Sequence, residues 1–222
     1  TTMASADSSA KARNAACGIG AAVGALGVKA LAEHNVLKLV DEAMESKKKE
    51  APSAREAGYL AVGVLCHTLK AEFEPYGIPL LLRMVKTITD KDKKVADAAT
   101  LGMRSLIEGL SGVSVKTVMP ALYEGMQVVG GGGRSKVECL QLAATLAKNA
   151  RRTMGPCLAE CIPHVLECLN DSNAKVQSAA EEALPVLCSC TDNAEVGSTL
   201  KGIIMEALKK PDTTFACIEE VL

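Results

Sequence analysis

The sequence predicts an all-α solenoid, in which antiparallel helix pairs stack one after another. The 222 residues are 48% hydrophobic, but only five are aromatic, and a helical pattern recurs about every 40 residues. A core with so few aromatic side chains consists mainly of aliphatic ones. The composition therefore disfavours a mixed α/β enzyme core, and the hydrophobic content disfavours a disordered chain.

The recurring pattern is an anchor residue, small or apolar residues three and four positions later, and an apolar helical stripe. It occurs six times at spacings of 42, 40, 42, 39 and 39 residues, beginning at Arg13, Arg55, Val95, Val137, Val176 and Phe215. A second helical series precedes these segments. In three of its helices Pro is expected in the first turn, where the missing amide proton is harmless: Pro79, Pro120 and Pro163. Residues 36–44 and 200–208 supply the corresponding helices of the second and last units.

Each unit is therefore a pair of antiparallel helices joined by a short polar turn. We expect about four complete pairs with half a unit at each end. Close helix contacts are expected at six small residues: Ala57, Gly58, Ala98, Ala99, Ala179 and Ala180. A period near 40, Pro in the first helix and Val-x-x-Ala-Ala in the second are typical of HEAT repeats.

The HEAT-repeat domain is expected to cover residues 11–222, and residues 1–10 to be disordered or foreign to the native chain. The cut ends of a stacked array expose apolar faces, so the native chain is also expected to continue.

Charge and cysteine content exclude several classes of protein. Lys and Arg number 25 against 26 Asp and Glu, so no global field draws the chain to nucleic acid or to a membrane. Nine cysteines, an odd number at irregular spacings, indicate reduced, buried thiols. The longest uncharged stretch, residues 14–28, is shorter than the roughly 20 residues of a membrane-spanning helix. We expect a cytoplasmic monomer with no DNA or membrane partner.

One group of residues has the composition of a zinc site: Cys157, Cys161, His164 and Cys168. On one helix these side chains would extend over about 16 Å, so they could not converge on an ion. A bent arrangement remains open, because Pro163 is expected to begin a helix after the first two cysteines. We assign the thiols, with Cys188 and Cys190, to the core between repeats and predict no metal.

Two glycine patterns resemble nucleotide motifs without matching them. Gly18, Gly20 and Gly24 miss the dinucleotide spacing by one position, and small residues four apart on a packed helix are the preferred interpretation. The run 130–136 lacks a phosphate-loop ending, which leaves either a general anion-binding corner or a mobile turn. The three histidines, His34, His67 and His164, fall in separate units, so no catalytic residue and no cofactor is predicted.

Turns inside the helix pairs should project along one common edge of the stack. The turn segments are 47–53, 90–94, 130–136, 170–175 and 209–213. Their 11 positive and five negative side chains give this edge a net charge of about +6, on a chain whose overall charge is -1. We predict contact with RNA phosphates or an acidic partner through Lys47, Lys48, Lys49, Lys91, Lys93, Lys94, Arg134, Lys136, Lys175, Lys209 and Lys210. The alternative is that turns simply favour Lys.

Residues 73–126 resemble the N-terminal HEAT region of translation elongation factor 3, a ribosome-bound ATPase family known mainly from fungi. The residues that carry this likeness are Glu74, Pro75 and Tyr76, the turn at 90–93, and Pro120. Residues 162–184 are similar to the following repeat. The resemblance implies ribosomal RNA and ribosomal proteins as partners of a non-catalytic docking surface. It also implies downstream cassettes that use ATP and Mg²⁺ to release deacylated tRNA from the ribosomal exit site.

A second family shares the same segment type: the large HEAT-repeat activator of the kinase that senses uncharged tRNA on ribosomes. Members of this group often carry Trp followed by a basic residue where this chain has residues 130–136, and this chain has no Trp. The chain therefore resembles a divergent member. The alternative function is a generic protein-binding scaffold, which would use the concave helix face and would need no RNA.

Overall fold

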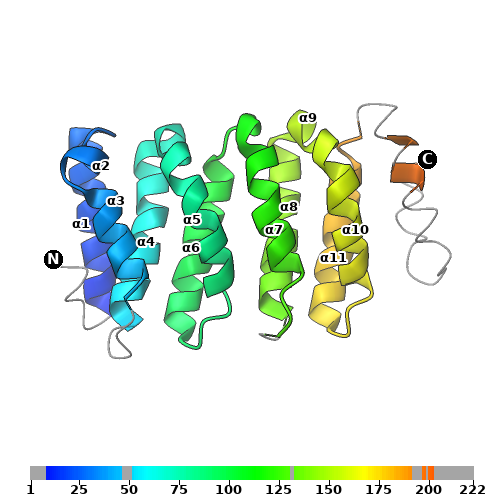
Figure 1. Ribbon diagram of the computed structural model, residues 1–222, viewed down its shortest axis with the longest axis horizontal. Coiled ribbons are helices and arrows are strands. Elements are labelled where there is room, and N and C mark those ends of the chain that lie inside the picture. Colours follow the sequence, from blue (N-terminus) through cyan, green and yellow to red (C-terminus); the bar gives the residue numbers. More distant parts are fainter. Residues whose placement is uncertain (1–8, 47–51, 131–132, 192–196, 199, 203–222) are drawn as a thin grey trace. The chain divides into compact units, whose positions relative to one another are not determined.

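The computed structural model describes residues 9–46, 52–130, 133–191, 197–198 and 200–202 (Figure 1). Within this part of the chain every regular element is an α-helix or a short 3₁₀ turn, which confirms the predicted all-α class. The chain divides into two compact units, unit 1 with residues 1–110 and unit 2 with residues 111–222. In each unit, antiparallel helices pack in pairs, and the second helices of consecutive pairs pack on one another.

Unit 1 is built around three long second helices. Its helices are α1 (Ser9–Leu26), α2 (Ala30–Glu33), α3 (Val36–Met44), α4 (Pro52–Leu69), α5 (Glu74–Thr87) and α6 (Lys93–Gly109). α3 pairs with α4 and α5 pairs with α6, while α4 packs against both α1 and α6 (Figure 1). Buried side chains such as Leu65 and Met103 fill the space between these helices. The bounds of α3 agree with the sequence prediction.

Unit 2 repeats the arrangement with two pairs. Its helices are α7 (Val115–Met126), α8 (Arg134–Asn149), α9 (Arg151–Met154), α10 (Leu158–Leu169) and α11 (Ala174–Cys188). α7 pairs with α8 and α10 pairs with α11, and the second helices α8 and α11 pack together (Figure 1). Leu140 and Leu184 are fully buried in this core. Of the expected last unit, the structure describes only 200–202 of the helix, and its second segment lies outside the described residues.

The first helices begin earlier than their prolines suggest. Pro79, Pro120 and Pro163 lie inside α5, α7 and α10, so their predicted place in the first turn is wrong. A 3₁₀ turn leads into each of these helices, and the residues before the proline are already packed, as the buried Val118 and Cys161 show. Burying these apolar side chains favours the helix even though Pro removes one backbone hydrogen bond.

The two fully described turns between paired helices use the same hydrogen bonds. Before α6, the Asp90 carboxylate accepts from the Asp92 amide at 2.9 Å, and Asp92 accepts from backbone amides in the first turn of α6. Before α11, Asp171 accepts from the Asn173 amide at 2.8 Å, and Asn173 caps α11. Each cap satisfies a donor that the helix leaves unpaired and contributes about 1 kcal/mol.

Helices approach most closely where small residues face a neighbour. A Cβ on Gly102 of α6 would lie 2.8 Å from the Tyr59 carbonyl oxygen of α4, and a Cβ on Gly58 would lie 2.9 Å from the Met44 backbone nitrogen. Neither site has room for a side chain. The residues predicted to make close contacts are all buried: Ala57, Gly58, Ala98, Ala99, Ala179 and Ala180.

The glycines of α1 are packing residues at two of the three positions considered. A Cβ on Gly20 would lie 2.1 Å from Val64 Cγ1, and one on Gly24 would lie 2.9 Å from Thr68 Cγ2, both in α4. Nothing lies within 4 Å of a Cβ on Gly18. The packing interpretation is therefore confirmed for Gly20 and Gly24 and is wrong for Gly18.

The first described helix starts two residues before the expected domain boundary, because α1 begins at Ser9. The Ser9 hydroxyl donates to Glu56 Oε2 of α4 at 2.9 Å, and Glu56 is only 5% exposed. A buried carboxylate requires such donors, so this bond ties the start of α1 to α4. The rest of the segment expected to be disordered, residues 1–8, lies outside the described residues.

Replacing Gly102 with Ala should lower the free energy of unfolding by about 1–3 kcal/mol, because the added methyl group meets backbone atoms of α4. The control is Gly109→Ala at the end of the same helix, where nothing lies within 4 Å of the new Cβ. This control should leave stability unchanged or raise it by up to about 1 kcal/mol. Urea denaturation of both variants measures the difference, and equal stabilities would contradict the close contact.

Candidate interaction surfaces

The turn before α6, taken together with the first two residues of this helix, presents three exposed lysines, Lys91, Lys93 and Lys94. The turn itself is fixed by an ion pair, because the Arg55 guanidinium of α4 bonds the Asp90 carboxylate. The side chains of this pair are 26% and 17% exposed, so the two charges compensate each other near the surface. The three lysines therefore carry the positive charge of this turn into solvent.

The turn before α11 is fixed in the same way. Lys136 Nζ of α8 donates to Asp171 Oδ2 at 2.6 Å, and the two side chains are 22% and 13% exposed. Lys136 and the Asn173 amide hold the pKa of the Asp171 carboxyl below its usual range. Lys175 is exposed, whereas Arg134 is half-buried. Lys136 thus has a structural partner that the sequence prediction did not foresee.

The two ion pairs are related by the repeat. Arg55 and Lys136 are 81 residues apart, as are Asp90 and Asp171, which corresponds to two repeat lengths. Each pair joins the start of a second helix to the next turn of the same unit, so these neighbouring turn regions lie side by side. A sequence signal for the pairs existed: an Asp two positions before the helix cap, with a basic residue 35 positions earlier.

Five of the eleven basic residues proposed from sequence lie outside the described residues: Lys47, Lys48, Lys49, Lys209 and Lys210. Of the other six, Lys91, Lys93, Lys94 and Lys175 are exposed, and Arg134 and Lys136 are half-buried. The structure therefore brings three exposed lysines together in one turn of unit 1. Contact of the eleven residues with RNA or with an acidic partner stays a prediction.

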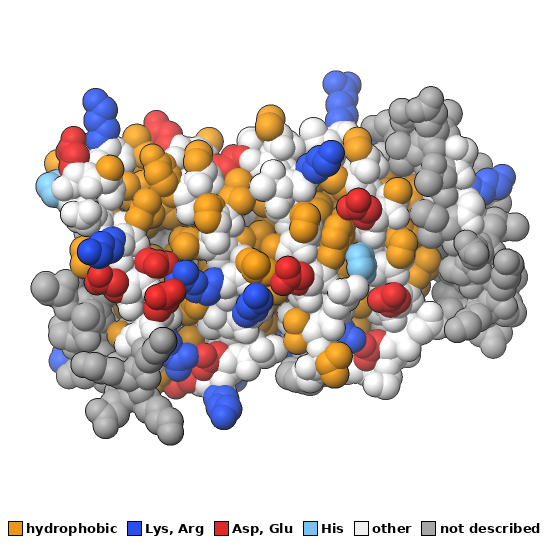
Figure 2. Space-filling model, viewed as in Figure 1, with side chains coloured by type: hydrophobic (Ala, Val, Ile, Leu, Met, Phe, Trp, Pro, Cys, Tyr) orange, Lys and Arg blue, Asp and Glu red, His pale blue; other side chains and the backbone are white. Residues whose placement is uncertain are grey.

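The first helices of unit 1 carry charges of both signs. Arg83 Nη2 of α5 lies 3.3 Å from Glu45 Oε1, and its Nη1 bonds Asp41 of α3. Figure 2 shows positive and negative side chains interspersed on the visible face of this unit. Such a face presents no field of a single sign to a charged partner.

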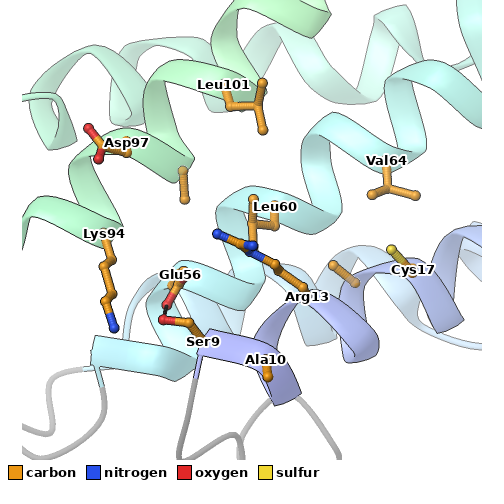
Figure 3. Close-up of a pocket in the computed structure, with 12 residues that line it drawn as sticks. Ser9, Ala10, Arg13, Cys17, Glu56, Leu60, Val64, Lys94, Asp97 and Leu101 are labelled. Carbon is orange, nitrogen blue, oxygen red and sulfur yellow. Dashed lines mark hydrogen bonds between the residues drawn. The ribbon is translucent and has the colours of Figure 1, made fainter.

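A groove of about 650 Å³ lies over α4, between α1 and α6 (Figure 3). Leu60 and Val64 of α4 form its apolar floor, and Leu101 of α6 is 53% exposed on its wall. Arg13 and Lys94 enter from the opposite walls, near the hydrogen bond between Ser9 and Glu56 described above. An apolar floor with a charged rim suits contact with a peptide or a protein surface.

Except for Cys17, the described cysteines are buried packing residues, so the prediction of buried thiols is wrong at Cys17, which is exposed. Cys157 lies in the 3₁₀ turn before α10, and Cys161, His164 and Cys168 follow along the helix itself. Within the described residues no three His, Cys, Asp or Glu side chains are placed to hold a metal ion. Burial raises the pKa of the Cys161 and Cys139 thiols to about 12. These thiols stay protonated at neutral pH.

His164 is engaged by neighbours on the surface of unit 2. Its ring stacks on Tyr123 of α7, with the ring centroids 4.8 Å apart, and its Nδ1 lies 3.3 Å from Gln127 Nε2. The Tyr123 hydroxyl donates to the Cys157 carbonyl oxygen at 3.2 Å.

None of the described helices has the length and hydropathy that crossing a membrane requires.

Comparison with known families identifies the family to which this helical array belongs. The sequence profile of the EF3 N-terminal HEAT repeat family matches residues 12–184, from α1 into α11. The chain belongs to the EF3 N-terminal HEAT repeat family. The resemblance derived from the sequence is thereby confirmed. A HEAT-repeat domain is a scaffold whose helix faces and turns make contacts, which agrees with the surfaces described above.

Relatives of this HEAT domain include GCN1 proteins, elongation factor 3 and an mRNA export factor. The eIF-2-alpha kinase activator GCN1 of Dictyostelium discoideum is 32% identical over 83% of this chain, and the stalled ribosome sensor GCN1 of Homo sapiens is 28% identical over 97%. Elongation factor 3 of Gonapodya prolifera is 27% identical over 96% of the chain. The HEAT domain spans only 7%, 8% and 20% of these relatives, respectively.

Thiol alkylation at pH 8 should distinguish exposed from buried cysteines of the HEAT domain. Cys17 is exposed, whereas Cys139 and Cys161 are buried and protonated, so iodoacetamide should label Cys17 rapidly and the other two only in denaturant. Peptide mass mapping gives the label at each site, and Cys17→Ser is the control. Rapid native labelling of Cys161 would contradict its core position.

Replacing Lys136 with Met should destabilise the HEAT domain by about 1–2 kcal/mol at pH 7, because Asp171 loses its charged donor. The pKa of Asp171 is lowered in the folded protein. The wild-type advantage is therefore complete above about pH 4 and disappears as the pH falls through the lower folded pKa. Urea unfolding between pH 7 and acid measures it, with exposed Lys175→Met as the control. A difference that is constant with pH would contradict the pairing.

Proposed function

We propose that this HEAT domain docks a larger translation-associated protein on the ribosome. The observation that carries the proposal is the family assignment, since the relatives of this chain include an elongation factor and a stalled ribosome sensor. The contact that suits this role best is the turn before α6, where Lys91, Lys93 and Lys94 are exposed to solvent. Lysine side chains bind phosphates and release counterions, which favours contact with ribosomal RNA.

Two finer functions follow from two of these relatives, elongation factor 3 and the kinase activator GCN1. On the elongation factor 3 interpretation, ATP-binding cassettes elsewhere in the whole protein would use ATP and Mg²⁺ to drive release of deacylated tRNA from the exit site. On the kinase-activator interpretation, the domain would report ribosome occupancy to a kinase and would need no ATPase. Ribosome-stimulated ATP hydrolysis by the whole protein distinguishes them.

A protein-binding scaffold is the second candidate, and the groove over α4 supports it. Its apolar floor and the 53% exposed Leu101 could receive a partner segment without any RNA. The affinity of such a partner would not depend on Lys91 or Lys93. It would depend on Lys94, because this residue lines the groove. Leu101→Asp should weaken binding of this partner and leave the affinity for ribosomes unchanged.

Charge reversal tests ribosome docking directly. Lys91, Lys93 and Lys94 are replaced together by Glu, and at positions 93 and 94 acidic residues suit the first turn of α6. Cosedimentation with ribosomes should show an affinity loss of about tenfold or more at low salt, and a shallower dependence on salt concentration. The wild-type chain should lose affinity steeply as salt rises.

The matched control reverses three exposed lysines of the same unit that lie away from this turn: Lys29, Lys38 and Lys70. It carries the same change of net charge, so a general field effect would weaken both variants equally. Equal losses, or no binding of the wild-type chain at low salt, would count against docking through the α6 turn.

A further inference from the structure

Four positively charged side chains gather at the end of unit 2 that lies away from the α10–α11 turn. We call this cluster the cationic corner, and it comprises Lys116, Lys148, Arg151 and Arg152. All four residues are exposed. Lys116 lies in the first turn of α7, Lys148 in the last turn of α8, and the two arginines begin α9. Figure 2 shows Lys and Arg side chains projecting at the edge of unit 2 where α9 lies.

Packing between short segments brings the four charges together. α9 contacts both α7 and the 3₁₀ turn Gly112–Ser114 that precedes it (Figure 1). The contact is close, because a Cβ on Gly112 would lie 3.1 Å from Thr153 Oγ1. Ala150 alone separates α8 from α9, so Lys148 is held beside the arginines. The corner is therefore built from three neighbouring parts of the chain, which are the start of α7, the end of α8 and α9.

Described carboxylates compensate little of this charge. Burial raises the pKa of the Cys157 thiol, the charge of Glu160 raises it further, and the charge of Lys116 lowers it. No described carboxylate lies within salt-bridge distance of Lys116, Lys148 or Arg152. Without counting Arg151, the three cations Lys116, Lys148 and Arg152 against the carboxylate of Glu160 leave a net charge of about +2.

The corner is specific to unit 2. At the corresponding linker of unit 1, between α4 and α5, Lys70 is accompanied by Glu72 and Glu74, so that linker is acidic. At the opposite edge of unit 2, Lys136 is bound to Asp171 and Lys175 is the exposed lysine. The exposed positive charge of the described part of unit 2 thus lies mainly at the corner rather than at the turn edge.

We propose that the cationic corner of unit 2 binds the phosphodiester backbone of duplex RNA. The proposal rests on the ribosome docking proposed above and assigns one of its RNA contacts. Exposed Thr117, Asn149 and Thr153 lie among the four cations. Lys, Arg, Thr and Asn are the side chains that contact phosphates and sugars, so the corner has the donors for backbone binding.

The surroundings favour duplex RNA over other anionic partners. Tyr123, the Phe, Tyr or Trp residue of the described part of unit 2, is only 9% exposed, so it is not available to stack on unpaired bases. Duplex RNA is read instead through its backbone and shape. A protein partner would need apolar or aromatic anchors, whereas the corner offers a single exposed valine, Val113.

Salt-dependent binding of an RNA duplex of about 20 base pairs, longer than the roughly 16 that a double-stranded-RNA-binding domain spans, tests the corner. The variant combines Lys116→Gln, Lys148→Gln and Arg152→Gln in the 222-residue chain. Its affinity should fall by about tenfold to a hundredfold at low salt. The slope of log affinity against log salt should flatten by about 0.9 for each phosphate that the variant no longer neutralises.

The matched control removes three exposed lysines of unit 1, with Lys29→Gln, Lys38→Gln and Lys70→Gln, and should keep wild-type affinity and slope. Thermal melting confirms that both variants fold. Equal reductions of affinity in variant and control, or an unchanged slope in the corner variant, overturn the proposal. So does corner-dependent binding of polyglutamate without binding of duplex RNA, which would assign the corner to an acidic protein.

Ribosome cosedimentation of the same proteins separates this proposal from the docking function. If the wild-type chain binds duplex RNA through the cationic corner but does not pellet with ribosomes, ribosome docking is refuted and RNA binding by the corner is supported. If the wild-type chain pellets with ribosomes and the corner variant binds duplex RNA as the wild type does, docking is supported and RNA binding by the corner is overturned.

Discussion

Close packing of consecutive second helices is the contact on which the rest of each unit depends. A helix pair cannot bury its apolar stripe alone, so α4 must touch both α1 and α6. Gly20 and Gly102 make this possible, because a Cβ at either position would collide with α4. The same closeness explains the aliphatic core. Wider helix spacing would change both the groove over α4 and the position of the turn before α6.

Charge pairing between a helix start and the next turn is the second constraint. The Arg55–Asp90 and Lys136–Asp171 pairs fix successive turns within their units, and they use basic residues for structure that would otherwise face solvent. As a result, the number of Lys and Arg in a turn does not measure its attraction for an anion. Only residues outside these pairs, such as Lys93, can serve a partner at little structural cost.

A HEAT scaffold with several modest surfaces is consistent with docking on a large assembly. Each surface is small: a lysine-rich turn and an apolar groove in unit 1, and a cationic corner in unit 2. Individually exposed charges contribute weakly at physiological salt, but several contacts made by one chain add through effective concentration. The relatives, of which this chain spans a small part, show that such a domain occurs inside much larger translation proteins.

Local periodicity of apolar residues was enough to predict the helical repeat, the small residues at the close contacts and the bounds of α3. It could not place the starts of α5, α7 and α10, since burial of the preceding turn outweighs the local preference of Pro79 and its equivalents. Tertiary structure also decided that Lys136 is paired and that Lys116 joins the arginines of α9. These outcomes depend on contacts between residues about 35 positions apart, which one linear pattern does not specify.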